Sequence, residues 1–164
     1  MYYLSKLVER ITINMNNEIM KKIDQFLSKK IDMGKVIELF YEIGKVLNDH
    51  HFSYYQISLL DMEIRKKYGL IISLSKKNLI KVVKFYQISQ NIPIEVLKKI
   101  DWNSYLILIN KKNYEELIKI YIQNKMNKRE LEYYLKTNKQ IKITMKYKDP
   151  ATDEFLKLQQ SIIK

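Results

Sequence analysis

The chain has 164 residues, 46% hydrophobic and 29% charged, with a formal net charge of +12, which indicates one globular domain whose basic balance suits a polyanionic partner such as nucleic acid. It contains no cysteine, which excludes disulfides, thiolate metal ligands and a cysteine nucleophile. Its longest aliphatic run, residues 106–109, is far shorter than the ~20 residues of a membrane span, and no secretory signal pattern opens the chain, so we expect a cytoplasmic protein without membrane contact.

Apolar residues recur at helical spacing along almost the whole chain, which predicts an all-α fold. In chain order, the spacing predicts helices over residues 3–11, 19–27, 33–47, 54–68, 76–89, 102–110, 114–123, 127–135 and 150–163. Gly69 is expected to end one of these helices, and N-caps are expected at Ser75, Asp101, Asn113 and Asn127.

The C-terminal part of the chain has a different pattern. Residues 140–147 alternate polar and apolar side chains, which is typical of a strand or an extended arm, and Pro150 suits the first turn of a last helix. We therefore expect an all-α domain with helix-turn-helix-like features and one short extended segment near its end. Its expected parts are a helical extension (1–32), a helical domain (33–138) and an arm with a last helix (139–164).

The positive charge is unevenly distributed. Lysine makes up 27 of the 30 basic residues, a bias typical of an AT-rich genome, so part of the charge reflects codon usage. However, residues 1–50 carry a net charge of only +1, whereas residues 51–100 carry +6 and residues 101–164 carry +5. Residues 66–99 hold eight lysines and one acid, Glu95. Codon bias does not explain this placement.

Residues 54–89 are predicted to form a helix, a tight turn and a second helix that contains no acidic residue. Lys77, Lys81 and Lys84 fall on one stripe of this second helix, and free amides at its N-terminus could also bind a phosphate. Because lysine binds phosphate as a point charge, we expect contact with a nucleic-acid backbone rather than base readout. An ordinary solvated face is the alternative interpretation. The expected contact residues are Lys66, Lys67, Ser75, Lys76, Lys77, Lys81 and Lys84.

A second helix-turn-helix pattern covers residues 114–135. Lys125, Lys128 and Arg129 surround the predicted N-terminus of its second helix and would add to a nucleic-acid surface. A helical hairpin that closes the core explains the same pattern, because sequence alone does not distinguish the two.

Residues that usually carry chemistry are scarce. The two histidines, His50 and His51, are adjacent and do not share a helix face, so they do not form a zinc-binding pair. Three glycines do not make a phosphate-binding loop. Asp61 and Glu63 lie on a predicted helix rather than on the hairpin of a nuclease site. We therefore expect a non-enzymatic protein with no catalytic residue, no metal and no cofactor.

Several short motifs follow one another over residues 33–137. They are Phe40-Tyr41-Glu42-Ile43-Gly44, Tyr68-Gly69, Leu74-Ser75-x-x-Asn78-Leu79 with Phe85-Tyr86, Asp101-Trp102-Asn103-Ser104-Tyr105, and Tyr121 followed by Met126-Asn127-Lys128-Arg129-Glu130-Leu131. In this order and spacing they resemble the N-terminal helical domain of the YhcG-like family. In longer relatives that domain precedes a PD-(D/E)xK nuclease domain.

The resemblance has departures and limits. Tyr105 stands where the family usually has histidine, and Met126 and Asn127 replace its tryptophan and serine. Lys148-Asp149-Pro150 and Glu154-Phe155-Leu156 are similar to the segment that leads into the nuclease domain, but no nuclease residue has a counterpart here. The resemblance implies a helix-turn-helix-like module that recognises nucleic acid beside a nuclease, in defence or mobile-element contexts.

These observations favour a non-enzymatic module that binds nucleic acid, double-stranded DNA in preference to RNA, in connection with a nuclease or defence system. The alternative is a protein-interaction module that pairs with or inhibits a nuclease or nucleic-acid-targeting complex, for example a phage-encoded inhibitor of host defence. Exposed apolar residues in 1–31 or 155–163 would support it, or would support a homodimer in which a second copy covers them. A catalytic nuclease is disfavoured for want of a carboxylate cluster.

Overall fold

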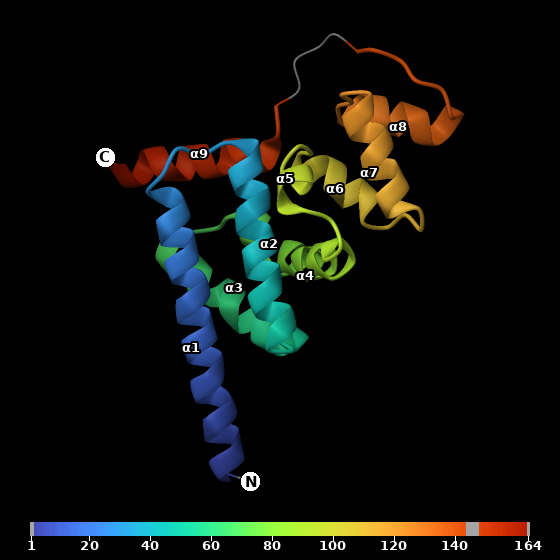
Figure 1. Ribbon diagram of the computed structural model, residues 1–164. Coiled ribbons are helices and arrows are strands. Elements are labelled where there is room, and N and C mark those ends of the chain that lie inside the picture. Colours follow the sequence, from blue (N-terminus) through green and yellow to red (C-terminus); the bar gives the residue numbers. More distant parts are fainter. Residues whose placement is uncertain (1, 144–147, 164) are drawn as a thin grey trace.

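The computed structural model describes residues 2–143 and 148–163, and helices dominate it (Figure 1). The helices are α1 (Tyr2–Leu27), α2 (Met33–Asp49), α3 (Tyr54–Tyr68), α4 (Lys76–Ser89), α5 (Ile94–Leu97), α6 (Trp102–Leu108), α7 (Tyr114–Gln123), α8 (Lys128–Thr137) and α9 (Pro150–Ile163), with a 3-10 turn η1 (Ile72–Leu74). The described residues contain no strand, so the all-α prediction is confirmed. None of these helices is long and apolar enough to cross a membrane.

The first two predicted stripes belong to one continuous helix, α1. Its C-terminal half is buried through Ile19, Ile23 and Phe26. Its N-terminal half extends past the rest of the molecule (Figure 1) and leaves large apolar side chains in solvent. The helix therefore has one half that belongs to the core and one half that does not.

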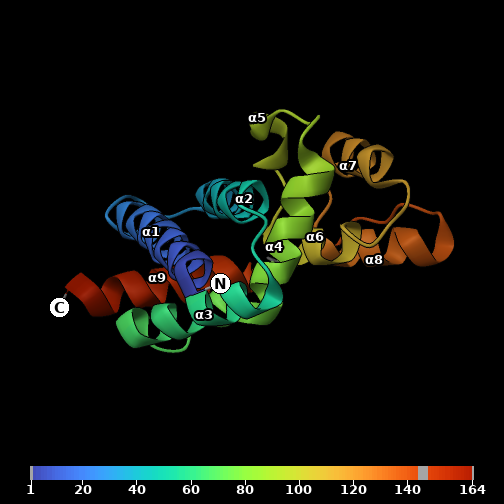
Figure 2. The same ribbon diagram turned by 90° about the horizontal axis from the view of Figure 1, so that it is seen from below.

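Helix α2 is the centre of the fold, since it packs against α1, α4, α5, α6 and α9. Asp32 caps its start by accepting a hydrogen bond of 2.9 Å from the Lys35 amide. Figure 2 shows α2 and α4 in the middle, with α1, α3 and α9 on one side and α6, α7 and α8 on the other. At Gly44 the backbone of α2 lies so close to α4 that an added Cβ would be 2.7 Å from the Val82 carbonyl oxygen.

The connection between α3 and α4 differs from the tight turn that was predicted. Gly69 ends α3 with a φ of 83°, as expected of a glycine in that position. Before α4 begins, however, the chain makes the turn η1, because Ile71 and Leu74 are both buried and anchor the connection in the core. Ser75 then caps α4 as predicted, accepting a hydrogen bond from the Asn78 amide.

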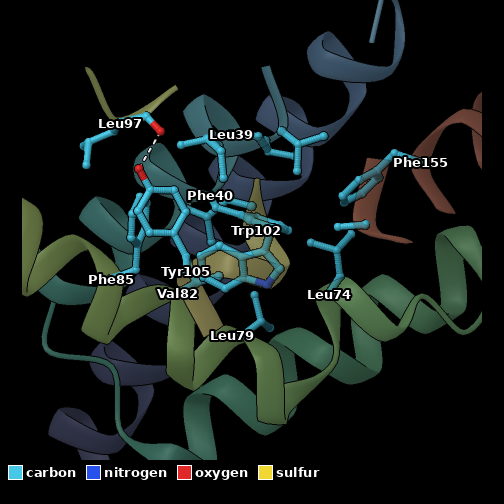
Figure 3. Packing of buried hydrophobic residues seen from close by; sticks show 14 of the residues in the cluster. Leu39, Phe40, Leu74, Leu79, Val82, Phe85, Leu97, Trp102, Tyr105 and Phe155 are labelled. Atoms are coloured by element: carbon cyan, nitrogen blue, oxygen red, sulfur yellow. Dashed lines mark hydrogen bonds between the residues drawn. The ribbon is translucent and has the colours of Figure 1, made fainter. Parts of the chain in front are cut away.

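Aromatic side chains fill the space between α2, α4 and α6 (Figure 3). The Phe40 and Trp102 rings meet edge to face with centroids 4.7 Å apart, and Phe85 packs on both Trp102 and Tyr105. The Tyr105 hydroxyl donates a hydrogen bond to the Leu97 carbonyl, so its burial leaves no polar atom unsatisfied. Most of the aromatic residues in the sequence motifs therefore serve this core.

Helix α9 returns across the molecule and seals the core. Phe155 is fully buried against the Phe26 ring of α1 and the Phe40 ring of α2. The Gln159 side chain donates hydrogen bonds of 2.9 and 2.7 Å to the carbonyls of Leu27 and Lys29. The three predicted parts of the chain thus contribute to one hydrophobic cluster.

The predicted extended segment is not confirmed. Residues 140–143 form no strand, and residues 144–147 lie outside the described residues. Lys142 holds this segment to α8, since its Nζ lies 3.5 Å from the Glu130 carboxylate and also donates to the Asn124 carbonyl.

Candidate nucleic-acid interface

The strongest candidate for a nucleic-acid surface is α4. One face of this helix is buried in the core, and its polar face carries four lysines and no acid. Lys77 and Lys84 are exposed, whereas Lys76 and Lys81 are half-buried, which places their aliphatic stems against the protein. The amphipathic pattern explains this arrangement, because burial of Leu79, Val82, Phe85 and Tyr86 turns the lysines outward.

Lys77 and Lys81 border a surface pocket of about 290 Å³. Its other lining residues come from η1, from the start of α4 with Asn78, from α6 and from the N-terminal part of α9. The Asn78 side chain is nearly buried and links two parts of the fold, since it accepts a hydrogen bond of 2.9 Å from Trp102 Nε1 and donates to the Ser73 carbonyl. The lysines therefore extend from a rigid support.

Among the described residues, the lysines of α4 are not neutralised by ion pairs, although the Glu154 carboxylate borders the same pocket as Lys77 and Lys81. Within the part of the chain that the structure describes, Lys76, Lys77 and Lys81 have no ion-pair partner, and Lys84 Nζ donates to the neutral Asn110 side chain at 3.1 Å. By contrast, Lys98 pairs with Glu38 at 3.5 Å. The lysines of α4 are thus available to an external anion.

The Glu154 carboxylate of α9 accepts hydrogen bonds from backbone amides that precede α4. Its two carboxylate oxygens accept hydrogen bonds of 3.0 and 2.8 Å from the Ile72 and Ser73 amides. The Ser75 hydroxyl donates to the Ile72 carbonyl at 2.7 Å and also caps α4. Of these contacts only the Ser75 cap uses an amide of α4, that of Asn78, whereas Glu154 places a negative charge close to this N-terminus. A phosphate at the N-terminus, which the sequence suggested, would be repelled by that charge, so the exposed lysine side chains are the better anion ligands.

Lys66 and Lys67 at the end of α3 face α1 rather than the pocket beside α4. Lys67 Nζ lies 2.5 Å from Asp24 Oδ2, and the Tyr68 hydroxyl donates to the same carboxylate. Burial pushes the pKa of Asp24 upward, but these hydrogen bonds outweigh it and lower the pKa overall. Lys66 borders a separate groove between α1 and α3. The structure therefore does not join these two lysines to the others in one pocket.

The corner between α7 and α8 holds the second predicted group. Lys125 is exposed in a left-handed backbone conformation with a φ of 48°, Arg129 is exposed as well, and Lys128 is half-buried. Lys128 pairs with Glu132 at 3.4 Å. Asn127 accepts a hydrogen bond of 2.9 Å from the Glu130 amide and caps α8 as predicted. More of the positive charge at this corner than on α4 is therefore neutralised by ion pairs within the protein.

A buried network of polar side chains lies near this corner. The sequence predicted only that Asp101 caps a helix and not the rest of the network. The Asp101 carboxylate is 4% exposed and accepts hydrogen bonds from the Ser104 hydroxyl at 2.6 Å and the Tyr121 hydroxyl at 2.9 Å. The Asp-Trp-Asn-Ser spacing was its only signal. Asp149 lies nearby, and burial, together with the negative charge of Asp101, raises the pKa of its carboxyl group.

The fold and this surface define an all-α protein in which one core-packed helix presents lysines that no ion pair among the described residues neutralises. Within the described residues, no group of three or more histidine or acidic side chains is placed to hold a metal ion. Comparison of the chain with protein-family models, with curated proteins and with solved structures found no match.

Proposed function

We propose that this protein is a non-enzymatic nucleic-acid-binding module of the cytoplasm that contacts double-stranded DNA in preference to RNA. The observation that carries the proposal is the set of α4 lysines without an acidic partner among the described residues. Lysine favours phosphate contact over base recognition, so the binding is weakly sequence-dependent and strongly salt-dependent. The resemblance to the YhcG-like N-terminal domain supports the same proposal and a role beside a nuclease.

The test is a charge-reversal variant of α4, K77E/K81E/K84E, measured by fluorescence anisotropy with a labelled duplex. We expect wild-type affinity to fall with salt at a logarithmic slope of at least about 3, since each phosphate contact contributes roughly 0.9. The variant is expected to lose duplex binding at low salt while it keeps its helical circular dichroism, because these side chains project from the core.

The matched control is K21E/K30E/K45E, which changes the net charge equally at exposed lysines of α1, α2 and the loop between them. If both variants lose binding to the same extent, net charge alone is responsible and the α4 assignment is wrong. An RNA duplex of equal length tests the preference for DNA. Equal or tighter RNA binding would overturn that part of the proposal.

The second candidate function is a protein-interaction module that pairs with or inhibits a nuclease. The observation that favours it is the exposed apolar half of α1. A wild-type protein that binds neither duplex, but forms a complex of defined stoichiometry with a purified nuclease, would replace nucleic-acid binding by this function.

A further inference from the structure

Two kinds of side chain line the pocket of about 290 Å³ beside α4. Helix α4 contributes the cations Lys77 and Lys81. The turn η1 and helices α6 and α9 contribute apolar groups, namely Ile72, Leu106 and Pro150. A phosphate by itself needs only the lysines. The apolar groups therefore indicate an occupant that joins an anionic part to an apolar part.

Ile72 differs from the residues around it, because its side chain is 70% exposed although its neighbours Ile71 and Ser73 are buried. Its backbone is held in place, since its amide donates a hydrogen bond of 3.0 Å to the Glu154 carboxylate. A single exposed isoleucine is ordinary on a protein surface, but this one lines a pocket that also contains lysines. A flat group such as a nucleic-acid base can pack on an apolar side chain held in this way.

The elements around the pocket are joined by hydrogen bonds. Trp102 Nε1 of α6 donates to Asn78 Oδ1 of α4 at 2.9 Å. Asn78 Nδ2 in turn donates to the Ser73 carbonyl, and the Ser73 amide donates to Glu154 Oε1 of α9 at 2.8 Å. These contacts hold α4, α6 and α9 in fixed positions around the pocket. An occupant therefore binds without a large cost in conformational entropy.

The size of the pocket suits one nucleotide rather than a length of duplex. Its volume of about 290 Å³ is at the lower end of the range of small-molecule sites. The bases of a continuous duplex are stacked and paired inside the double helix, so they do not enter a protein cavity unless they are unpaired. A nucleic-acid group that fills this pocket is therefore an unpaired nucleotide.

Glu154 distinguishes such a nucleotide from a phosphate alone. Its carboxylate lines the same pocket as Lys77 and Lys81, so it repels a phosphate close to it and attracts N–H donors. Each carboxylate oxygen accepts one backbone amide and keeps a second lone pair. An unpaired base presents N–H donors on its Watson–Crick edge. Both signs of charge in the pocket thus match parts of one nucleotide.

We propose that this pocket binds one unpaired nucleotide at the end of a DNA duplex. Lys77 and Lys81 bind its phosphate, and its base packs on Ile72. Lys76 and Lys84 lie outside the pocket and contact the adjoining duplex. The proposal rests on the proposed function, since the same helix binds the DNA backbone in both. Because every base has a flat face, the preference is for an unpaired nucleotide and not for one base.

The first test compares duplexes of equal paired length by fluorescence anisotropy with the full chain. One duplex is blunt, and others carry a single unpaired nucleotide at both 3′ ends or at both 5′ ends. We expect an unpaired nucleotide of the better polarity to tighten binding at least about fivefold, as the stacking of one base does elsewhere. An abasic residue in the same position keeps the sugar and the phosphate and should lose most of that gain.

The outcomes separate this proposal from the proposed function. If the blunt duplex binds and neither overhang binds more tightly, the pocket proposal is wrong and the proposed function stands. If the abasic overhang binds as tightly as the normal one, the base does not enter the pocket. If none of the duplexes binds, both proposals fail.

The second test changes the pocket wall. I72S removes the exposed apolar side chain and should reduce the preference for the unpaired nucleotide at least about threefold, with little effect on the blunt duplex. L70S is the matched control, because Leu70 is 65% exposed in the same connection but does not line the pocket. Circular dichroism should be unchanged in both variants, since both side chains are mostly in solvent. An equal loss of preference in the two variants, or none in I72S, overturns the proposal.

Discussion

At the scale of single residues, the sequence motifs serve mainly to hold the fold together. Asn78 connects Trp102 to the Ser73 carbonyl through two hydrogen bonds. Asp101 caps α6 and also accepts hydrogen bonds from two buried hydroxyl groups. Gly44 allows α2 and α4 to touch. Each of these residues could be conserved in a family for stability alone, so the motifs do not themselves identify the binding surface. The lysines that carry the proposal lie between them.

The close contact at Gly44 predicts that adding one methyl group there lowers the free energy of unfolding substantially. In G44A the added Cβ would lie 2.7 Å from the Val82 carbonyl oxygen and 2.8 Å from Tyr86 Cβ, so α2 and α4 must separate. We expect a loss of about 1–3 kcal/mol in the free energy of unfolding, measured in urea. In G34A the nearest atom is Lys98 Cε at 3.3 Å, which can move. That control should be neutral or stabilising, and an equal loss in both would contradict this account.

Asp149 predicts a dependence of stability on pH. Burial and the charge of Asp101 raise its pKa above the unfolded value of 3.8, so the folded state binds this proton more tightly than the unfolded state. The contribution of the residue to stability is therefore greatest in acid and is lost as the pH rises through the folded pKa. Asp149 Oδ2 accepts hydrogen bonds from the Thr152 amide and hydroxyl. In D149N the side-chain oxygen can accept the same hydrogen bonds without the charge, so the variant should be more stable than wild type at pH 7.

The difference in unfolding free energy between D149N and wild type should shrink as the pH falls through the raised pKa of folded Asp149 towards the unfolded value of 3.8, and should level off below it, where the wild-type side chain is protonated in both states. Urea unfolding at pH 7 and at acid pH measures it. D153N removes the same charge one turn later and serves as the control. A stability difference that is independent of pH would exclude the ionisation of Asp149 as its cause.

At the scale of secondary-structure elements, α4 is a structural helix and a candidate binding helix at once. Its apolar face packs on α2 and α3, and its lysines point outward. Glu154 of α9 binds the amides just before it, so the last helix both stabilises the start of α4 and places a carboxylate beside Lys77 and Lys81. The first effect stabilises the helix that would bind an anion, whereas the second repels that anion.

The variant E154Q should separate these effects. A glutamine has one acceptor oxygen for two amides, so the unfolding free energy should fall by about 1–3 kcal/mol. The loss of a negative charge beside Lys77 and Lys81 should raise the affinity for a duplex about two- to fivefold at low salt. E18Q removes an exposed charge from α1 and is the control for net charge. An equal gain in E18Q would show that proximity to α4 is irrelevant.

At the scale of the whole molecule, α9 makes one core out of segments that the sequence pattern separates. Phe155 packs against aromatic rings of α1 and α2. Gln159 donates a hydrogen bond to the Leu27 carbonyl at the end of α1, where the loop to α2 begins. Phe155 and Leu158 are buried, so the core covers this part of the apolar side of α9, whereas Ile162 near its end stays 55% exposed. Most of the exposed apolar side chains of the two end helices therefore lie on the projecting half of α1.

Loss of the ring at Phe155 should therefore affect the entire fold. F155A is expected to cost about 3–5 kcal/mol of unfolding free energy, since it leaves a cavity between three helices. I162A, at a position of the same helix that is 55% exposed, should cost less than about 0.5 kcal/mol. Thermal unfolding followed by circular dichroism compares the two. Similar midpoints would mean that α9 is not part of the core.

Much of this structure could be read from local patterns. Helical periodicity and the caps at Ser75, Asp101 and Asn127 placed the helices within a few residues, because both depend on interactions between near neighbours in the chain. The merging of two stripes into α1 and the turn η1 were missed, since they depend on what the segments pack against. Lys77 and Lys81 were correctly expected on one face of α4, but their separation from Lys66 and Lys67 depends on how α3 lies against α1.

The sequence by itself therefore determined the helical class, the limits of most helices and the concentration of lysine on α4, all of which are local in the chain. Only the tertiary structure decided which charges are neutralised and which apolar faces are covered. Glu154 binds Ile72 across 82 residues of sequence, and Phe155 meets Phe26 from the opposite end of the chain. Burial and ion pairing depend on which faces meet in space, and no local pattern encodes that.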